Sequence, residues 1–315
     1  MAERSGGLYG GAGGFLILDK PRGFTSHDVV ARVRRLTGER RVGHTGTLDP
    51  LATGVLVVCL GKATRLAEYV SEGDKIYRAE VRLGIVTDTW DAEGTVLSEA
   101  DPSPITRQAV EEVLVRFTGE IWQTPPAFSA LKQQGRPLYR LARRGVAVEP
   151  PPRRVTIYRI SLDLWAPPKM TLTVHCSKGT YIRSLAHDIG QALGVGAHLA
   201  GLVRLAVGPF RLEEAISLEV LARSAQEGDW PVHLVPMARA LEHLGAVIVE
   251  GSILEDILHG RQVPLEHPQK EDLCAAYDAR GELVAILAYD AQSGLWQPRK
   301  VLMDGPKGRR SAEAV

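Results

Sequence analysis

One loop of the sequence combines polar side chains with three glycines and leads directly into an apolar segment. Residues 43–54 read GHTGTLDPLATG, with Asp49 near the centre. Loops that rigid elements hold in place commonly carry binding and catalytic residues. An aspartate before a proline is, however, most often a turn former, because its carboxylate bonds nearby backbone amides. A catalytic interpretation of Asp49 therefore needs other residues that could act with it.

Two further side chains of chemical interest lie far from this loop in the sequence. Tyr77 falls on the apolar side of an alternating segment, and Arg183 follows the turn residues 178–181 at the start of a predicted helix. A phenol and a guanidinium can both take part in catalysis beside a carboxylate. Each also has a structural interpretation, with Tyr77 as part of the core and Arg183 as a surface or structural charge.

Other glycine-rich, acidic and cysteine-containing segments do not match cofactor or metal motifs. Residues 10–14 precede the first predicted strand, and residues 61–64 lack the upstream glycine and the hydroxyl of a P-loop. The acidic residues at 88–94 do not have the spacing of a calcium-binding loop. The three cysteines form no CxxC pair. We therefore expect neither a cofactor nor a catalytic metal.

Length and composition indicate a globular protein of two domains. The chain has 315 residues, of which 44% are hydrophobic and 24% charged. The clear apolar run at 55–60 is far shorter than the roughly 18 residues of a membrane helix. Residues 1–13 contain Glu3 and many glycines in place of the apolar core of an export signal. With so few cysteines, we expect a cytoplasmic protein.

The elements that must position these residues are strands and helices in irregular order. Strands are predicted at 15–18, 55–60, 75–83 and 170–176, and a helix is predicted from Thr25 or Ser26 to Gly38. A second helix starts after Thr106 and is expected to stop at Gly119, and a third follows the turn 177–179. The irregular order favours an α+β fold over a regular βαβ repeat.

The C-terminal third differs from the rest of the chain. Residues 212–245 are predicted to be mainly helical, and 246–304 are predicted to form a small β-rich domain, with strands at 273–277 and 283–289 around a turn. Residues 1–13 and 305–315 are expected to be a flexible leader and tail. The expected domains are therefore 14–245 and 246–304.

Basic residues are concentrated although the net charge of the whole chain is only +1. Residues 132–154 contain seven basic residues and one acidic residue, a local net charge of +6. A second group of arginines lies at 32–41. Such clusters can neutralise phosphates and so bind nucleic acid in a salt-dependent way, although most charge runs are solvated surfaces.

Five motifs together resemble the TruB family of bacterial tRNA pseudouridine synthases. In chain order they are LDKPRGFTS at 18–26, the loop at 43–54, KxYR…LGxxTDTxDxxG at 75–94, FSALKQQGRPLYRLARRG at 128–145 and CSKGTYIRSLAHDIG at 176–190. The resemblance covers residues 14–210 and is looser beyond them. Residues 44–46 and 51–53 resemble the bacterial form rather than the guide-RNA-dependent relatives, which implies a standalone enzyme.

The resemblance implies an activity and three catalytic residues. The protein would isomerise uridine 55 in the TΨC loop of tRNA to pseudouridine after flipping the base out of its stack. Asp49 would be the catalytic carboxylate, attacking either the ribose C1′ or the uracil C6. Arg183 would pair with Asp49 and keep it ionised once RNA closes the pocket. Tyr77 would stack on the base, and it is also a candidate for handling the C5 proton.

The same resemblance implies substrate-binding residues. His44 would enter the space that the flipped base leaves, and Tyr181 would position Asp49 and Arg183. Leu202 would cover the uracil, unless it only packs in the core, and Lys20 would support the loop that carries Asp49.

The implied architecture is a pseudouridine synthase domain with a mixed, largely antiparallel sheet, followed by a PUA-type RNA-binding domain at 246–304. An insertion at about 125–154, containing Arg143 and Arg144, would clamp the T arm, and the C-terminal domain would grip the acceptor end. The resemblance implies that the protein binds tRNA and does not bind a membrane. It also implies a monomer that needs no protein partner.

Two other functions are compatible with the residues. A tRNA-folding protein could use the same basic surfaces and His44 without needing Asp49. A hydrolase could use Asp49 on a glycosidic bond, but the two-carboxylate mechanism needs an acid partner for which no motif stands out.

Overall fold

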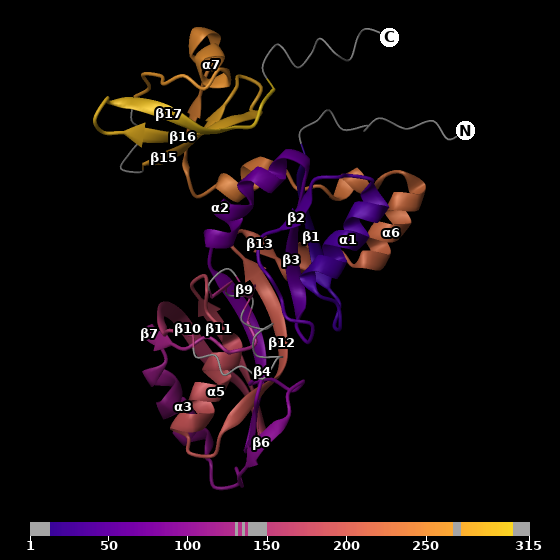
Figure 1. The fold of residues 1–315 in the computed structure, drawn as a ribbon, viewed down its shortest axis with the longest axis vertical. Coiled ribbons are helices and arrows are strands. Elements are labelled where there is room, and N and C mark those ends of the chain that lie inside the picture. The colour runs from indigo at the N-terminus through magenta and orange to yellow at the C-terminus, as the bar shows by residue number, and fades with distance from the viewer. Residues whose placement is uncertain (1–12, 130–131, 134–135, 138–149, 267–271, 305–315) are drawn as a thin grey trace.

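The fold is organised around a long nine-stranded sheet with a small separate domain at one end (Figure 1). The structure is a computed structural model and describes residues 13–129, 132–133, 136–137, 150–266 and 272–304. Residues 1–12 of the leader expected at 1–13, the tail at 305–315 and the residues Arg143 and Arg144 lie outside this described part. The predicted α+β fold with a mixed sheet and a β-rich C-terminal domain is confirmed.

The main sheet has the strand order β1-β3-β12-β4-β11-β10-β7, with β2 paired to β3 and β13 paired to β12. All its described pairings are antiparallel except β3 with β12, which run parallel. The strands are β1 (Gly14–Lys20), β2 (Val42–His44), β3 (Thr53–Leu60), β4 (Lys75–Leu83), β7 (Gly119–Gln123), β10 (Arg153–Ala166), β11 (Lys169–Cys176), β12 (Ala197–Val207) and β13 (Phe210–Arg211).

Strands β1 and β3 are covered on both faces, which explains their unbroken apolar sequence. Alternate residues of β1 point into two different cores. Leu16 and Leu18 pack with α1 (Ser26–Thr37) and α6 (Leu218–Glu227). Phe15 and Ile17 pack with the 3-10 helix η1 (Gly61–Leu66), with α2 (Ala67–Glu72) and with η4 (Met237–Leu241). The strand predicted at 55–60 is confirmed as buried on both sides.

Strands β4 and β11 alternate between buried and more exposed residues, as predicted. Their buried side packs under α3 (Arg107–Arg116) and α5 (Ile182–Ala192). Tyr77 belongs to this buried side together with Ala79, Val81 and Leu83. Figure 1 shows α3 and α5 at the lower part of the sheet, at the opposite end from α1 and α6. The sheet therefore joins two separately packed halves.

The predicted helix ends are confirmed except for one. Thr25 caps α1 by accepting the Asp28 amide, and Gly38 follows the helix with φ of 71°, a left-handed conformation that glycine adopts without strain. Thr106 caps α3 as predicted. The prediction that Gly119 ends α3 is wrong, because the helix ends at Arg116 and Gly119 starts β7 with φ of 95°. The apolar stripe continues through Phe117, which made the helix look longer.

The region after β13 is helical only in short pieces. It contains η2 (Leu212–Glu214), α6, η3 (Trp230–His233) and η4. The C-terminal domain then has a four-stranded sheet of β14 (Gly245–Ile248), β15 (Leu273–Tyr277), β16 (Leu283–Asp290) and β17 (Leu295–Val301). It also contains α7 (Gly251–Leu258), which the β-like reading of 246–304 does not predict. A helix of one or two turns with no side-chain cap leaves little trace in the sequence.

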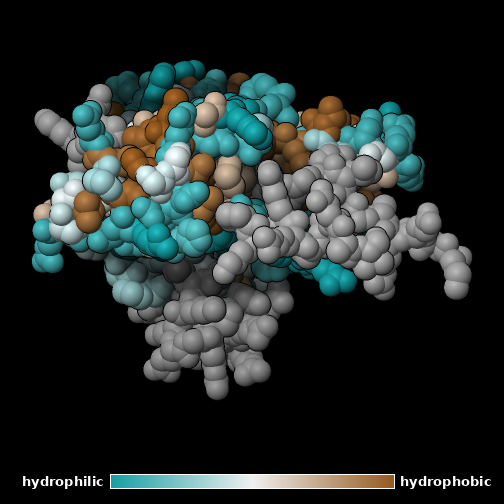
Figure 2. All heavy atoms as spheres, turned by 90° about the horizontal axis from the view of Figure 1, so that it is seen from above, coloured by the Kyte–Doolittle hydropathy of each residue, from teal (hydrophilic) through white to brown (hydrophobic). Residues whose placement is uncertain are grey.

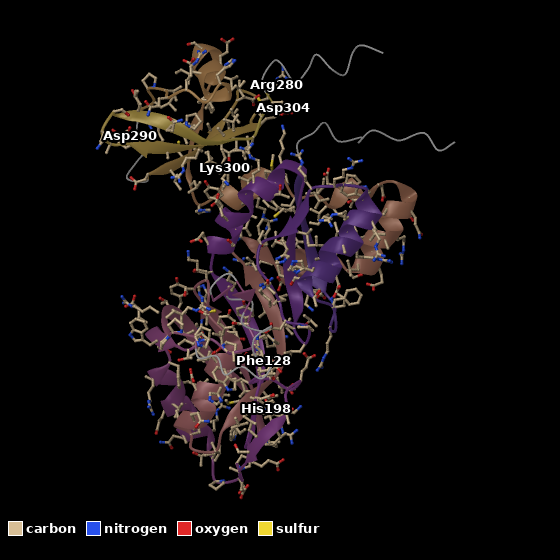
Figure 3. All side chains as sticks on the ribbon, in the orientation of Figure 1. Phe128, His198, Arg280, Asp290, Lys300 and Asp304 are labelled. Atoms are coloured by element: carbon tan, nitrogen blue, oxygen red, sulfur yellow. The ribbon has the colours of Figure 1, made fainter. Side chains whose placement is uncertain are left out.

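The C-terminal domain is docked on the main domain by apolar and charged contacts. Leu283 and Ile286 belong to the same core as the η1 and α2 residues. Lys62 pairs with Asp304 at 2.8 Å, and Lys300 pairs with Glu68 of α2. Figure 3 shows Lys300 on the side of the domain that faces α2. Seen from above, the surface of this end carries hydrophilic and hydrophobic patches side by side (Figure 2).

Two small two-stranded ribbons complete the described structure. A two-stranded ribbon of β5 (Ile85–Thr87) and β6 (Val96–Glu99) follows β4, and β8 (Lys132–Gln133) pairs with β9 (Arg136–Pro137). Within the described residues, no helix is long and apolar enough to cross a membrane.

Candidate active site

A cavity of about 370 Å³ lies where the loop of residues 45–49 meets β4, β12 and the start of α5. Asp49, Tyr77, Tyr181, Arg183 and Leu202 all line it. The structure therefore brings together five of the predicted site residues, which the sequence separates by up to about 150 positions. Its volume falls in the range of small-molecule sites.

Three anchors hold the loop that carries Asp49. The hydroxyl of Ser26, at the start of α1, accepts the Leu48 amide at 2.9 Å and donates to the Leu48 carbonyl at 3.3 Å. The guanidinium of Arg204 donates from Nη2 to the Gly46 carbonyl at 3.1 Å. The Gly23 amide donates to the Pro50 carbonyl at 2.8 Å. These bonds fix the loop against both α1 and β12.

Lys20 contacts the same loop through the Pro50 carbonyl. Its ammonium is fully buried and donates to the carbonyls of Pro21, Phe24 and Pro50 at 2.9, 2.7 and 3.4 Å. Burial lowers the pKa of Lys20 to about 8, and the nearby Asp49 carboxylate opposes that change. Lys20 does not line the cavity. Its position agrees with a supporting role for Lys20 rather than a chemical one.

Gly54 is required where the loop enters β3. Its φ is +94°, and a Cβ atom there would lie 2.3 Å from the Arg204 carbonyl oxygen. We expect Gly54→Ala to lower the free energy of unfolding by roughly 1–3 kcal/mol, because both the backbone conformation and the space exclude a side chain. Urea unfolding measures this change.

The matched control for Gly54 is in the same loop. A Cβ atom at Gly43 would contact nothing within 4 Å, and the Gly43 φ is not in the left-handed range. Gly43→Ala should therefore leave stability nearly unchanged. An equal effect of the two substitutions would contradict the close approach of Gly54 to β12.

Asp49 and Arg183, expected to pair, form an ion pair with 2.9 Å between Oδ2 and Nε. The Arg183 side chain is only 5% exposed, whereas Asp49 retains 35% exposure toward the cavity. Burial raises the pKa of Asp49, and the positive charge of Arg183 opposes the increase. Arg183 thus shifts the pKa of Asp49 in the direction that favours the ionised carboxylate, as expected, but burial has the larger effect on this pKa.

The remaining nitrogens of Arg183 are also used. Nη2 donates to the Phe128 carbonyl at 3.0 Å, and Nη1 donates to the Thr89 carbonyl at 3.3 Å. Asp91 Oδ2 lies 3.6 Å from Nη1. Contacts to three separate segments fix the guanidinium plane, so that Nε faces Asp49. The second carboxylate, Asp91, contributes to raising the pKa of Asp49.

Tyr77 and Leu202 form an apolar part of the cavity wall. They are 8% and 9% exposed and belong to the core under α5. Burial raises the pKa of Tyr77, and the guanidinium of Arg204 only partly opposes this. Tyr77 is therefore a protonated phenol at neutral pH. This state suits stacking on a base better than accepting a proton. Leu202 is both a core residue and a cavity residue, so its two interpretations are not alternatives.

Tyr181 precedes α5 and is held by its backbone. Its amide donates to Gln123 Oε1 at 2.7 Å, and Gln123 Nε2 donates to the Tyr181 carbonyl at 3.0 Å. The Arg153 guanidinium lies over its ring, 4.9 Å from the centroid. The ring therefore forms a wall of the cavity beside Arg183.

His44 lies at the end of β2 and outside the cavity lining. Its Nδ1 accepts the Gly46 amide at 3.2 Å, and its ring meets the His27 ring edge to face at 5.4 Å. Burial lowers the pKa of His44 to about 4, so its imidazole is neutral at physiological pH. A neutral aromatic ring at this position can take the place of a base in a stack.

Sequence reasoning missed three polar residues of the site. Asp91 belongs to the TDTxDxxG motif but was considered only as a calcium ligand. Arg204 is 2% exposed and lines the cavity, and the signal for it is a single arginine within the apolar strand LVRLAV. Lys75, the first residue of the KxYR motif, also lines the cavity.

The described residues contain no cluster of three or more histidine, cysteine, aspartate or glutamate side chains that could hold a metal ion. The described residues that line the cavity supply one carboxylate, several cations and several hydroxyls. This set is suited to a polar, anionic ligand with one ring to stack.

Comparison with known families gives two matches. The sequence profile of the TruB family pseudouridylate synthase N-terminal domain matches residues 34–182. The profile of the tRNA pseudouridylate synthase B C-terminal domain matches residues 183–243. Both matches include parts of the cavity, because the first contains Asp49 and Tyr77 and the second contains Arg183 and Leu202.

Individual relatives agree with these profiles. The chain is 53% identical to the tRNA pseudouridine synthase B of Syntrophotalea carbinolica over 72% of this chain and 74% of the relative. It is 42% identical to that of Dehalococcoides mccartyi strain BAV1 over 92% and 96%. Among solved structures, a Cbf5-Nop10-Gar1 complex contains a chain with a TM-score of 0.73 and 31% identity, covering 93% of this chain and 86% of that one.

Proposed function

Because this chain belongs to the TruB family of tRNA pseudouridine synthases, we propose that it isomerises uridine 55 in the TΨC loop of tRNA. The observation that carries this proposal is the ion pair of Asp49 and Arg183 inside a cavity walled by Tyr77. A carboxylate that is held beside a cation can remain ionised when the substrate excludes water. It is then available as a nucleophile.

The chemistry that the site must support is an isomerisation. The glycosidic bond from N1 to C1′ breaks, the uracil turns, a bond from C5 to C1′ forms, and the proton on C5 is replaced by one on N1. Asp49 can serve by attacking C1′ or C6 and leaving again, because either route needs a carboxylate that bonds to carbon and is released. Substrate and product have the same atoms, so the reaction itself consumes no second substrate.

The geometry also supports base flipping. The target base of a folded RNA must leave its stack to reach Asp49, at a cost of a few kcal/mol. The cavity can receive it between Tyr77 and Leu202. His44, neutral and next to the loop, would fill the vacated position in the RNA. Lys20 would keep the loop in place during this step.

The experiment that tests the proposal maps pseudouridine by position. An unmodified tRNA transcript is incubated with the protein, and each uridine is then examined. We expect conversion at position 55 and none in a transcript that carries cytidine there. Conversion at another position with position 55 unmodified would contradict the proposed specificity.

We also propose that the basic segment at 132–154 contacts the T arm. Arg143→Ala together with Arg144→Ala should weaken tRNA binding and reduce the slope of log Kd against log salt by roughly one to two units, because fewer phosphates are neutralised. Binding titrations at several salt concentrations measure this slope.

The control for this pair removes the same charge elsewhere. Arg107 and Arg116 lie on α3, and Arg107 is paired with Glu111 on the same helix. Replacing both with alanine should leave the slope unchanged. Equal slopes for the wild type and the Arg143/Arg144 variant would reject the contact.

We extend the proposal to the C-terminal domain and to the cellular setting. The docked domain, expected at 246–304, would grip the acceptor end of the same tRNA, held in a fixed direction by its contacts with η1 and α2. The protein would act as a monomer in the cytoplasm, on tRNA alone. Size-exclusion chromatography of the protein with tRNA tests the stoichiometry.

A further inference from the structure

A cationic group on the cavity wall has two nitrogens without an acceptor among the residues that the structure describes. Arg153, the first residue of β10, lines the same cavity as Asp49. Its Nε and Nη2 atoms are shielded from solvent and bond no acceptor among the described residues. Buried donors are normally paired, because they lose their hydration without compensation otherwise. The cavity therefore presents donors that are ready for an acceptor.

The position of this guanidinium is fixed. It lies over the Tyr181 ring, with Cζ 4.9 Å from the centroid, and its Nη1 packs near Gly179 of the turn before α5. The next residue, Arg154, is 60% exposed on the side chain and pairs with Glu120 of β7. Successive residues of a strand point to opposite faces, so β10 directs Arg153 to the cavity and Arg154 to the surface.

The charges around the cavity indicate the kind of acceptor. Among the described residues, those that line it with a charge are one carboxylate and five cations: Asp49, Lys75, Arg153, Lys178, Arg183 and Arg204. Asp49 is already paired with Arg183, and Lys178 with Glu72. Ser129, which also lines the cavity, has a buried hydroxyl without a partner among the described residues. An anion with several acceptor oxygens would satisfy Arg153 and Ser129 together.

We propose that Arg153 binds a phosphodiester group directly beside the uridine that enters the cavity. This inference rests on the proposed function, because a flipped nucleotide brings its own two flanking phosphates to the cavity. The planar fork of arginine can bond two phosphate oxygens at once. Arg153 would thus hold the backbone of the extruded nucleotide, while Asp49 acts on its base or sugar.

The test combines a protein change with an RNA change. A T-arm RNA is prepared with a neutral methylphosphonate in place of the phosphate on either side of the target uridine. Kd is measured for the wild type and Arg153→Met, with Arg154→Met as the control. For the wild type we expect a loss of affinity of about tenfold or more at one of the two linkages.

The variants then separate the possible outcomes. On RNA with normal phosphates, Arg153→Met should lose about as much affinity as the wild type loses from that methylphosphonate. Adding the methylphosphonate to the RNA should then cost Arg153→Met no further affinity. Arg154→Met should respond to the methylphosphonate like the wild type. If a methylphosphonate at either linkage lowers the affinity of Arg153→Met as much as it lowers that of the wild type, the inference is overturned. Absence of pseudouridine with wild-type protein and normal RNA would instead count against the proposed function.

Thermal unfolding of the free protein gives an independent readout. If Arg153 serves a ligand, replacing it by methionine removes two unpaired donors, so Tm should stay the same or rise. If Arg153 is only structural, Tm should fall and the affinity for RNA should not change. The combination of lower affinity with an unchanged or higher Tm supports the phosphate site, and the reverse combination overturns it.

Discussion

Asp49→Asn is expected to lower pseudouridine formation by roughly 10⁴-fold or more while tRNA binding stays close to that of the wild type. Asparagine has nearly the same shape and keeps an oxygen beside Arg183 Nε, so the loop should keep its position. It cannot act as an anionic nucleophile, however. Single-turnover conversion of an unmodified transcript and a filter-binding Kd measure the two quantities.

The control for this variant is a carboxylate far from the cavity. Asp163 on β10 bonds the hydroxyls of Ser161 and Thr173 and does not line the cavity. Asp163→Asn should leave the rate unchanged. Conversion by Asp49→Asn at the wild-type rate would remove Asp49 from the chemistry.

Arg183→Met is expected to reduce kcat/KM at pH 7 by roughly 10²- to 10³-fold. The substitution leaves the half-buried Asp49 without the cation 2.9 Å away, so the carboxylate gains a proton more readily. It also releases the carbonyls of Thr89 and Phe128. Initial rates at several tRNA concentrations give kcat/KM.

Two further variants separate charge from general damage. Arg183→Lys keeps a positive charge but lacks the planar fork whose separate nitrogens face different segments, so it should recover only part of the activity. Arg107→Met removes an exposed arginine from α3 and should have no effect. Wild-type activity of Arg183→Met, with the fold intact by thermal unfolding, would contradict the role given to this ion pair.

The sequence predicts local structure well where one physical rule decides it. Continuous burial of β3, the alternation of β4 and β11 and the caps of α1 follow from patterns within a few residues. The sequence predicts too late an end for α3, because Phe117 extends the apolar stripe beyond Arg116. The helix α7 was missed because it is short and uncapped.

The candidate site could be predicted only in part. Asp49, Tyr77 and Arg183 were found through motifs, but their meeting in one cavity depends on strand order, which no local pattern contains. Arg204 bonds the Val55 carbonyl across 149 residues of sequence, and this contact exists only because β12 pairs with β3. Asp91 lies in a motif that the sequence suggests only as a calcium loop, and its place near Arg183 depends on tertiary packing.

The pH dependence of kcat/KM tests most directly whether an ionised Asp49, held by Arg183, carries out the reaction. This quantity reports the protonation of groups in the free enzyme. Burial raises the pKa of Asp49 above its ordinary 3.8, so activity should be lost as the pH falls through this raised value. Removing the cation raises the pKa further. In Arg183→Lys the ammonium no longer lies as close to the carboxylate. The acidic limb of its profile should therefore lie at higher pH than the wild-type limb. Acidic limbs at the same pH would contradict the account.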